Sequence, residues 1–420
     1  MLAFAAVALT DEYWSGIAIA GAPDVERAHD VGHGTYALLT FTLPFLGSAL
    51  FDAALALLAD HASRRRVASF GMLGISLGSW GCALGGGWLS LPIGLACAGA
   101  ASGMACSAAQ AELIERGAAD REQAMMRWVF YGAIGDVLTP ALAALVIRAG
   151  GDYRDAFVLA AIWTLVHAAW LWPRRKARLV GTEGREVVSN GEARAFASAS
   201  DEAGVGSSSG TDALAQNHDD PDDAPAASLI EGLRAGVANR RLWLWLLGAS
   251  LCTFLDEIVI ALGALHAERD LGAEPAAAVA IVTSTSLGGV VGVALTARLL
   301  PSISAERVLI ASAGGASLAL LGVLLAPNLL CLALCLAVLG VVAAPQYALL
   351  QARAYAALPG RPGVVNALAQ AFVVVDVLAP LALGALADRW GVVAALGCLA
   401  VQPFGVLALT LWSRRTKTSA

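Results

Sequence analysis

The sequence predicts an all-α polytopic membrane protein in which twelve transmembrane helices form two pseudo-symmetric bundles of six. Of its 420 residues, 58% are hydrophobic and 14% are charged, and the mean hydropathy is +0.69. A soluble domain is about 45–50% apolar and about 25% charged. The excess of apolar residues therefore excludes an ordinary soluble enzyme. The apolar residues fall in twelve long runs, and polar motifs in the first six runs return in the last six.

Each apolar run contains 18 to 25 residues, which is the length that an α-helix needs to cross about 30 Å of hydrocarbon. Membrane-spanning strands would instead alternate apolar and polar residues over about ten positions. These runs do not alternate, so helices are expected. The predicted spans are residues 2–22, 35–59, 67–87, 89–111, 128–148, 156–173, 242–265, 276–300, 308–326, 329–352, 364–386 and 392–412.

Basic residues are concentrated in alternate loops, and this asymmetry predicts the orientation of the chain. If both termini are cytoplasmic, the inside loops contain the arginine clusters at 64–66, 174–178, 240–241 and 414–415. The outside loops then contain only scattered arginines. By the positive-inside rule, we expect an integral protein of the cytoplasmic (inner) membrane with both termini in the cytoplasm.

A polar segment separates the two sets of spans. Residues 181–227 are rich in Gly, Ser, Ala and acids, and cannot bury enough apolar surface to offset the entropy of ordering. This composition predicts three parts: an N-terminal bundle over 1–175, a largely disordered acidic cytoplasmic linker over 176–238, and a C-terminal bundle over 239–415. A regulatory role for the linker stays open. Its acids account for the formal net charge of −6 of the whole chain.

Short motifs repeat between the two sets of spans at nearly constant offsets. GDVLTP at 135–140 returns as VDVLAP at 375–380, and the Asp-Glu pair at 11–12 returns at 256–257. A duplicated six-helix unit would leave this pattern. Weak internal symmetry is typical of secondary transporters, whose binding site lies near the membrane midplane where the repeats meet.

The loop after the second predicted span carries a recognisable motif. Residues 56–66 read ALLADHASRRR. The motif resembles the signature between helices 2 and 3 of the major facilitator superfamily, a Gly-x-x-x-Asp-basic-x-Gly-basic-basic pattern in which Ala56 and Ser63 replace the glycines. With the twelve spans, the central linker and the duplication, the resemblance covers nearly the whole chain. It implies the major facilitator fold.

Three residues of this chain match the charged positions of the signature: Asp60, Arg64 and Arg65. A carboxylate near an arginine pair can form charge-assisted hydrogen bonds in one conformation and break them in another. The resemblance implies that these residues form a cytoplasmic gate that supports the outward-facing state. Asp52, about two turns earlier on the same predicted helix, is expected to belong to this gate.

Acidic residues lie inside the predicted spans, where each ionisable group costs several kcal/mol and indicates a functional site. The six residues are Asp11, Glu12, Asp136, Asp256, Glu257 and Asp376. The superfamily resemblance implies that their helices line or flank one central cavity. Neighbouring helical residues point about 100° apart, so we expect one member of each Asp-Glu pair to face the cavity. Asp136 and Asp376 each precede a proline by four residues, and a capping role for them stays open.

Clustered carboxylates that lose hydration repel one another, so some of them are expected to carry a proton near neutral pH. A negatively charged cavity also favours a cationic or hydrogen-bond-donating substrate. We therefore expect proton-coupled export, or antiport, of a small cationic or amphipathic organic molecule. The alternative is proton-coupled uptake, or symport, of a neutral small metabolite or sugar. Proton-coupled drug exporters of the superfamily offer a partial resemblance, an acid in helix 1, although residues 132–140 lack their Gly-Pro step.

The remaining expectations concern other polar groups and other function classes. Gln110, Arg353 and Gln370 are possible polar residues of the cavity. The sequence has no nucleophile-base constellation and no cysteine spacing typical of zinc, so we expect no enzyme activity, no metal site and no cofactor besides the proton gradient. The expected partners are a small-molecule substrate, protons and the lipid bilayer, with no nucleic acid and a monomeric chain. A metal-cation exporter and a non-transporting receptor are less favoured alternatives.

Overall fold

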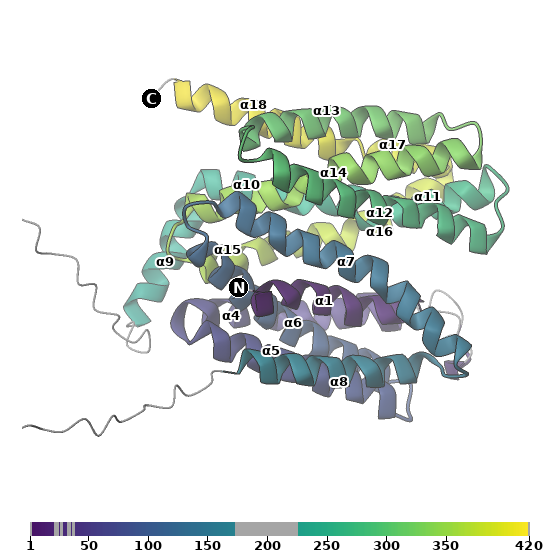
Figure 1. Ribbon diagram of the computed structural model, residues 1–420, viewed down its shortest axis with the longest axis horizontal. Helices are drawn as coiled ribbons and strands as arrows, with labels where there is room; N and C mark the ends of the chain where they lie inside the picture. The colour runs from purple at the N-terminus through teal and green to yellow at the C-terminus, as the bar shows by residue number, and fades with distance from the viewer. Residues whose placement is uncertain are drawn as a thin grey trace, which may run out of the picture.

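The computed structural model describes residues 2–20, 25, 28–31, 35, 38–172 and 226–418. Most of the predicted linker therefore lies outside the described residues. The described chain forms two stacked groups of long helices that run in roughly the same direction (Figure 1). No strand occurs among the described residues.

The first group contains six long helices, one for each of the first six predicted spans. A π-helical turn at Leu38–Thr42 leads into the second of them. The helices are α1 (Leu2–Ala20), α4 (Leu43–His61), α5 (Arg64–Leu84), α6 (Ser90–Arg116), α7 (Arg121–Arg148) and α8 (Tyr153–Leu171).

The second group covers the last six predicted spans, but three of these spans are each built from two shorter helices. The helices are α10 (Arg240–Ser250), α11 (Glu257–Arg269), α12 (Pro275–Leu299), α13 (Ala305–Leu324), α14 (Leu329–Ala357), α15 (Pro362–Ala369), α16 (Val373–Trp390), α17 (Val392–Cys398) and α18 (Val401–Thr418). Helix α9 (Ala226–Ala238) precedes them, so the last part of the predicted linker is helical.

Within the described residues, nine helical stretches are long and apolar enough to cross a membrane, and a bent tenth covers residues 38–58. Together with α1 and α7, these stretches occupy the twelve predicted spans. The structure confirms the predicted all-α fold with two six-span halves.

Glycines allow the helices of each half to pack closely. In the first half, a Cβ at Gly78 of α5 would lie 2.6 Å from the carbonyl oxygen of Gly94 on α6. In the second half, a Cβ at Gly288 of α12 would lie 2.1 Å from the carbonyl oxygen of Ala337 on α14. Small residues let helix backbones approach where lipid supplies no hydrophobic driving force.

The seventh predicted span is broken near its middle. Helix α10 ends at Ser250, a 3-10 turn covers Leu251–Leu255, and α11 begins at Glu257 after Asp256, whose backbone is at φ −106° and ψ −79°. The turn contains neither glycine nor proline. Its conformation is instead fixed from outside, because the amide of Leu255 donates a 2.8 Å hydrogen bond to Oε1 of Gln402 on α18. The equivalent helix of the first half, α1, is continuous.

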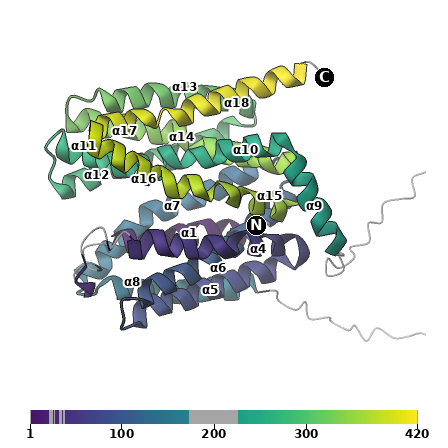
Figure 2. The same cartoon turned by 180° about the vertical axis from the view of Figure 1, so that it is seen from behind.

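The two halves contact each other through α7 against α12 and α14, and through α4 against α15. Figures 1 and 2 show α4 and α15 together beside the start of α1. Helices α5, α13 and α15 begin at this end of the molecule with Arg64–Arg66, Arg307 and Arg361 at or near their first residues. We call it the arginine-rich end, and the other end the opposite end.

Candidate functional site

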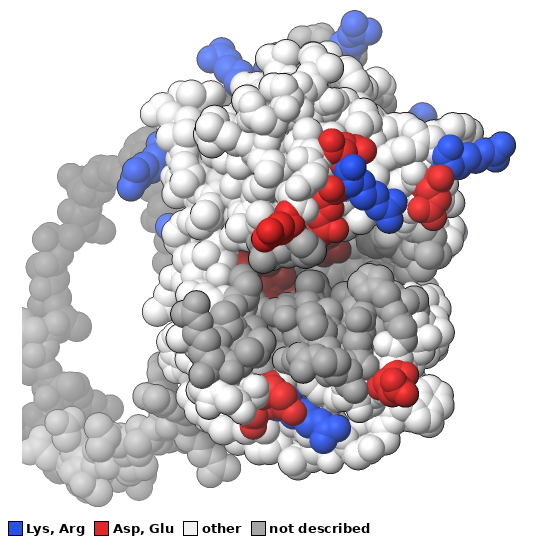
Figure 3. All heavy atoms as spheres, turned by 90° about the vertical axis from the view of Figure 1, so that its right-hand side faces the viewer, with Lys and Arg blue, Asp and Glu red and all other residues white. Residues whose placement is uncertain are grey.

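A cavity of about 450 Å³ lies between the two halves. Its walls come from α1, α6 and α7 of the first half and from α10, α11, α12, α14, α15, α16 and α18 of the second. Figure 3, which views the opposite end, shows a hollow between the two halves with acidic side chains inside it. Pockets for small organic ligands span about 300–1,000 Å³, so this cavity can hold a metabolite-sized molecule.

Five of the six predicted intramembrane acids line this cavity: Asp11, Glu12, Asp136, Asp256 and Glu257. The side chain of the sixth, Asp376, lies outside the described part of the structure. Among the described residues that line the cavity there is no Lys, Arg or His. The fixed charge of the described walls is therefore entirely acidic.

Asp11 is held on the side of α6. The indole of Trp14 donates a 3.1 Å hydrogen bond to its Oδ1, and the hydroxyl of Ser102 donates to the same oxygen. The thiol of Cys106 donates to Oδ2 at 3.4 Å. Three donors therefore surround this carboxylate, two of them from α6.

Glu12 is held on the side of α7, so the two members of this pair line the cavity in different directions. A Cβ at Gly135 of α7 would lie 2.8 Å from the Cβ of Glu12, which shows how closely the helices approach. A Cβ at Gly132, one turn before Asp136 on α7, would lie 3.9 Å from Oε1 of Glu12. Glu12 and Asp136 therefore line the cavity from two adjoining helices.

Asp256 and Glu257 lie at the break between α10 and α11, on the other side of the cavity. Both residues are exposed and line it. The acids of both halves therefore line one cavity across the boundary between the halves.

The predicted polar residues divide between two places. Gln110 and Gln370 line the cavity. Arg353 is not among the lining residues: its guanidinium forms an ion pair with Glu306 on α13 at 3.2 Å and lies over the ring of Trp245. The acid at the start of α13 thus draws this arginine toward the arginine-rich end and away from the cavity.

A buried polar group that the sequence does not single out closes the cavity at the arginine-rich end. The hydroxyl of Tyr355 on α14 lies 2.6 Å from Oε1 of Gln110 on α6 and 2.6 Å from Oδ1 of Asn366 on α15. The Asn366 amide also donates to the carbonyl of Ser107 at 3.5 Å. Because a phenol has one proton, one of these two amides must present its NH₂ group to the tyrosine oxygen. The one sequence signal is the pseudo-repeat of Gln110 at Gln351, which places α14 opposite α6.

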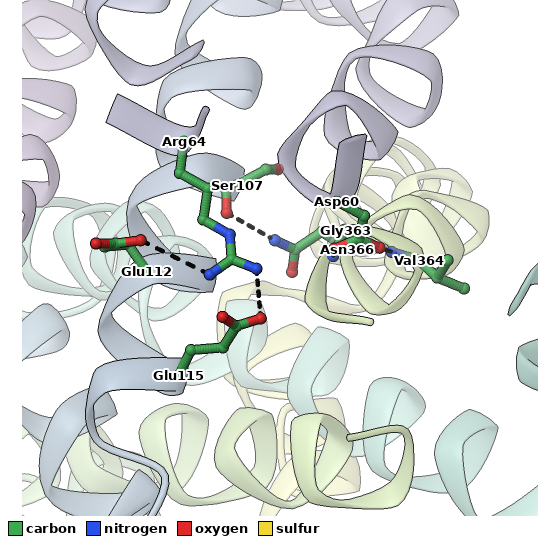
Figure 4. Close-up of polar contacts among 8 residues, drawn as sticks. All are labelled: Asp60, Arg64, Ser107, Glu112, Glu115, Gly363, Val364 and Asn366. Atoms are coloured by element: carbon green, nitrogen blue, oxygen red, sulfur yellow. Dashed lines mark hydrogen bonds and ion pairs between the residues drawn. The ribbon is translucent and has the colours of Figure 1, made fainter. Parts of the chain in front are cut away.

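Asp60, at the end of α4, contacts the second half directly. Its carboxylate accepts hydrogen bonds from the backbone amides of Gly363 at 2.7 Å and Val364 at 3.0 Å, in the first turn of α15 (Figure 4). A carboxylate at a helix N-terminus pairs with free amides and with the positive end of the helix dipole. A Cβ at Gly363 would lie 2.7 Å from the carbonyl oxygen of Ala56, so glycine permits this approach.

The two signature arginines act within the first half. Arg64 pairs with Glu112 at 3.7 Å and with Glu115, both on α6 (Figure 4). Arg65 donates from Nε to the carbonyl of Leu171 at 2.6 Å, at the end of α8. Asp60 thus bridges the halves through backbone amides, and Arg65 contacts the end of α8.

Asp52, the fourth expected gate residue, lies beside α6. Its Oδ1 is buried without a hydrogen-bond partner in the described structure, and a Cβ at Gly103 of α6 would lie 2.7 Å from it. The position is two turns from Asp60, and the described contacts of Asp52 do not reach α15.

The comparison with protein families identifies the chain. A profile of the Major Facilitator Superfamily matches residues 3–375. The chain belongs to the Major Facilitator Superfamily. It is therefore an integral membrane transporter by family, and the fold and site described above are those of a superfamily member. A comparison with curated protein sequences finds no significant match.

Solved structures of the Major Facilitator Superfamily share the fold. One is the transporter FucP in the outward conformation, at 14% identity and a TM-score of 0.67, with 98% of this chain and 97% of that chain covered. A variant of the E. coli fucose:proton symporter FucP gives 13% identity and a TM-score of 0.69, covering 97% and 98%. The proton:xylose symporter XylE bound to 6-bromo-6-deoxy-D-glucose gives 14% identity and 0.67, covering 99% and 94%.

Within the described residues, no group of three or more His, Cys, Asp and Glu side chains is arranged to hold a metal ion. The five described acids of this superfamily member line the cavity from α1, α7 and the start of α11.

Proposed function

We propose that this protein is a proton-coupled secondary transporter that works by alternating access, with its arginine-rich end in the cytoplasm. The observation that carries the proposal is a cavity lined by five acids and, among its described residues, by no basic side chain; Glu12 and Asp136 form a carboxyl pair in it on the adjoining helices α1 and α7. Carboxyl groups that share a poorly hydrated site cannot all ionise, so one of them retains a proton.

The pair is placed where a transported proton must be held. Glu12 and Asp136 lie on α1 and α7, and both line the cavity. When the cavity opens toward one side of the membrane, the pair exchanges its proton with the solution on that side. The alternation between the two sides then couples proton movement to substrate movement.

The contacts at the arginine-rich end support an outward-facing state in this structure. Asp60 joins α4 to α15, and Tyr355 joins α14 to α6 and α15. Opening of this end requires all these hydrogen bonds to break. We assign Asp60 and Tyr355 to the cytoplasmic gate on this basis.

Two transport modes remain, each supported by a different observation. The acid-only charge of the described cavity walls favours antiport of a cationic or amphipathic organic molecule. FucP and XylE, whose solved structures share the fold, are proton symporters of fucose and xylose, which favours proton-coupled uptake of a neutral metabolite or sugar. The amides of Gln110 and Gln370 in the cavity suit hydroxyl groups.

The direction of proton flow separates these modes. Purified protein is reconstituted in liposomes that contain a pH-sensitive dye, and candidate substrates are added outside in the absence of a gradient. Symport acidifies the lumen, whereas antiport makes it more alkaline. Substrate exchange without a proton signal for any candidate would contradict proton coupling.

The carboxyl pair is tested in the same liposomes with Glu12→Gln and Asp136→Asn. Each variant removes the ionisable partner, so we expect loss of proton movement with retained substrate exchange. Asp388→Asn, at an exposed position near the end of α16, is the matched control. Wild-type proton flux in both Glu12→Gln and Asp136→Asn would exclude the pair as the proton site.

A further inference from the structure

We propose that helix α9 lies in the headgroup region of the membrane at the arginine-rich end, and that anionic phospholipids bound to it stabilise the closed state of this end. The partner of its exposed face is the lipid surface. This inference rests on the alternating access proposed above, but not on proton coupling. It adds a lipid contact that regulates the gate.

Helix α9 is joined to a membrane-spanning helix by a single residue. It ends at Ala238, and α10, the first part of the seventh span, begins at Arg240. Asn239 holds the corner between them. Its Oδ1 accepts a 3.2 Å hydrogen bond from the amide of Leu242, and its Nδ2 donates to the carbonyl of Ala357 at 2.8 Å. The end of α9 therefore lies where the seventh span leaves the bilayer.

The direction of α9 differs from that of the spans. Figures 1 and 2 show it crossing the arginine-rich end, steeply inclined to the long helices. The indole of Trp243 on α10 donates a 2.9 Å hydrogen bond to the carbonyl of Val237, which holds α9 in this direction. A helix that crosses the bundle at this level runs along the membrane surface.

One face of α9 presents apolar side chains that the protein does not cover. Ile230 and Val237 are 68% and 57% exposed, and a spacing of seven residues places them on the same face of a helix. Arg234, also exposed, lies between them along the helix. The exposed Glu231 follows Ile230 directly, so its side chain points about 100° away. Apolar side chains bordered by an arginine are typical of helices that lie in the membrane surface.

The charge near this face complements an anionic lipid surface. Arg234, Arg240 and Arg241 are all exposed, and Glu231 is the only acid in α9. A basic side chain close to an anionic leaflet strengthens binding by about fivefold. The adjoining span is surrounded by the same lipid, so the bilayer reaches α9 without a further component.

Another face of α9 packs on the helix that closes the arginine-rich end. Gly232 and Gly236 are buried on this face. A Cβ at Gly232 would lie 2.5 Å from Nη1 of Arg361, the residue before α15. A Cβ at Gly236 would lie 3.1 Å from Cγ1 of Val364, whose amide donates to Asp60. Helix α9 therefore contacts α15 at the turn that binds α4.

This packing connects the lipid contact with the gate. A lipid shifts the equilibrium between two states only if the protein contacts it differently in each of them. Opening of the arginine-rich end separates α15 from α4, and α9, packed on α15, moves with it. The position of α9 described above belongs to the closed end, so lipid that holds α9 in this position favours closure.

The first test measures how deeply α9 lies in the membrane. Nitroxide labels are attached to Ile230→Cys and, separately, to Glu231→Cys, after replacement of the seven native cysteines. The protein is reconstituted in liposomes of phosphatidylcholine and phosphatidylglycerol. We expect the label at 230 to collide mainly with oxygen, which dissolves in the bilayer, and the label at 231 with a water-soluble nickel chelate. Equal access of the chelate to both labels would overturn the proposal.

The second test measures the effect of lipid charge on the gate. Hydrogen exchange of the backbone amides in α15 is compared in liposomes of phosphatidylcholine alone and of phosphatidylcholine with phosphatidylglycerol. We expect exchange to be about three- to fivefold slower with the anionic lipid, the contribution of one arginine near an anionic surface. Equal exchange rates in the two membranes would overturn the regulatory contact.

Variants then assign the effect to α9. Arg234→Gln and the double variant Ile230→Ser with Val237→Ser are each expected to remove most of the lipid effect on exchange in α15. Arg307→Gln is the matched control, because it removes an exposed arginine of the same end on α13. An equal loss in Arg307→Gln and Arg234→Gln would indicate a general effect of surface charge and overturn the role of α9. Thermal unfolding in neutral liposomes identifies any folding defect.

These measurements distinguish the inference from the proposed function, since none of them requires transport. If wild-type protein shows both lipid effects but moves neither substrate nor protons, the lipid contact stands and the proposed function fails. If proton-coupled transport is observed but exchange in α15 is the same in both membranes, the proposed function stands and the lipid contact fails.

Discussion

The hydroxyl of Tyr355 on α14 lies 2.6 Å from Oε1 of Gln110 on α6, directly across the boundary between the two halves. Tyr355 is 2% exposed and Gln110 also lines the cavity. Gln110 and Asn366, the two partners of Tyr355, therefore belong both to the floor of the cavity and to the seal at the arginine-rich end. Any motion that opens this end must separate them.

Tyr355→Phe removes the hydroxyl and leaves the amides of Gln110 and Asn366 with one buried partner fewer. We expect the closed state to lose about 1–3 kcal/mol relative to the open state, the cost of an unsatisfied buried polar group. Hydrogen exchange of the backbone amides in α15 should become faster. Tyr131→Phe, on α7 away from this contact, is the control. Unchanged exchange in α15 would show that the hydroxyl does not hold the seal.

Asp60→Asn tests the contact between α4 and α15. An asparagine retains one carbonyl oxygen for the amides of Gly363 and Val364 but loses the charge that complements the helix N-terminus. We expect the closed state of this end to lose about 0.5–2 kcal/mol of stability relative to the open state. In a background in which the seven native cysteines are replaced, a maleimide reagent applied from the arginine-rich end should then react faster with a single cysteine introduced at Ser107. The matched control is Asp120→Asn, on the exposed loop before α7, and an equal rate in both variants would contradict the prediction.

An ion pair with reversed polarity connects helices at the same place in both halves. In the first half, Arg64 at the start of α5 pairs with Glu112 on α6. In the second half, Glu306 in the first turn of α13 pairs with Arg353 on α14, and Arg414 also reaches this glutamate at 3.6 Å. The repeat thus keeps the pair while it exchanges the signs.

Glu306→Gln should lower stability by about 1–3 kcal/mol, because a charge-assisted hydrogen bond is lost and Arg353 is mostly buried, with its side chain 15% exposed. The double variant Glu306→Arg with Arg353→Glu recreates the polarity of the first half. In detergent, we expect its thermal unfolding midpoint to recover at least half of the decrease that Glu306→Gln causes. Arg414 limits the recovery by repulsion. A double variant no more stable than Glu306→Gln would show that the pair is not interchangeable.

Gly288→Ala tests the close packing of α12 on α14. The added Cβ would lie 2.1 Å from the carbonyl oxygen of Ala337, so the helices must separate, and we expect a loss of at least about 1–3 kcal/mol. Gly314→Ala on α13 is the control, since nothing lies within 4 Å of its Cβ position. Comparison of the two thermal unfolding midpoints checks the prediction, and equal midpoints would contradict it.

Hydropathy was enough to predict the helical fold and the places of its spans, because each apolar run must satisfy its own backbone in lipid. The same reasoning singled out the acids, and Asp11, Glu12, Asp136, Asp256 and Glu257 all line one cavity. Both results follow from the free-energy cost of polar groups in hydrocarbon, which depends on the type of each single residue and can be taken directly from the sequence.

Contacts between distant segments were not readable in this way. The signature predicts a role for Asp60, but its partners at Gly363 and Val364 follow only from the docking of the two halves. The sequence predicts that Arg353 lines the cavity, yet an ion pair with Glu306 on another helix determines its position. The turn after α10 contains no glycine or proline from which a break could be predicted. A hydrogen bond from its backbone to Gln402 on α18 holds it instead.

Gln402 itself is positioned by a residue behind it: its Nε2 donates a 3.0 Å hydrogen bond to Oε1 of Gln346, which is 0% exposed. The shape of the wall at Asp256 therefore depends on a side chain that no solute touches. Substitutions at Gln346 would change substrate selection indirectly, because they would shift the backbone that Gln402 holds. The side chains that contact the solute would stay the same. Such hidden positions offer a route by which a transporter of this fold can acquire new cargo without rebuilding its cavity.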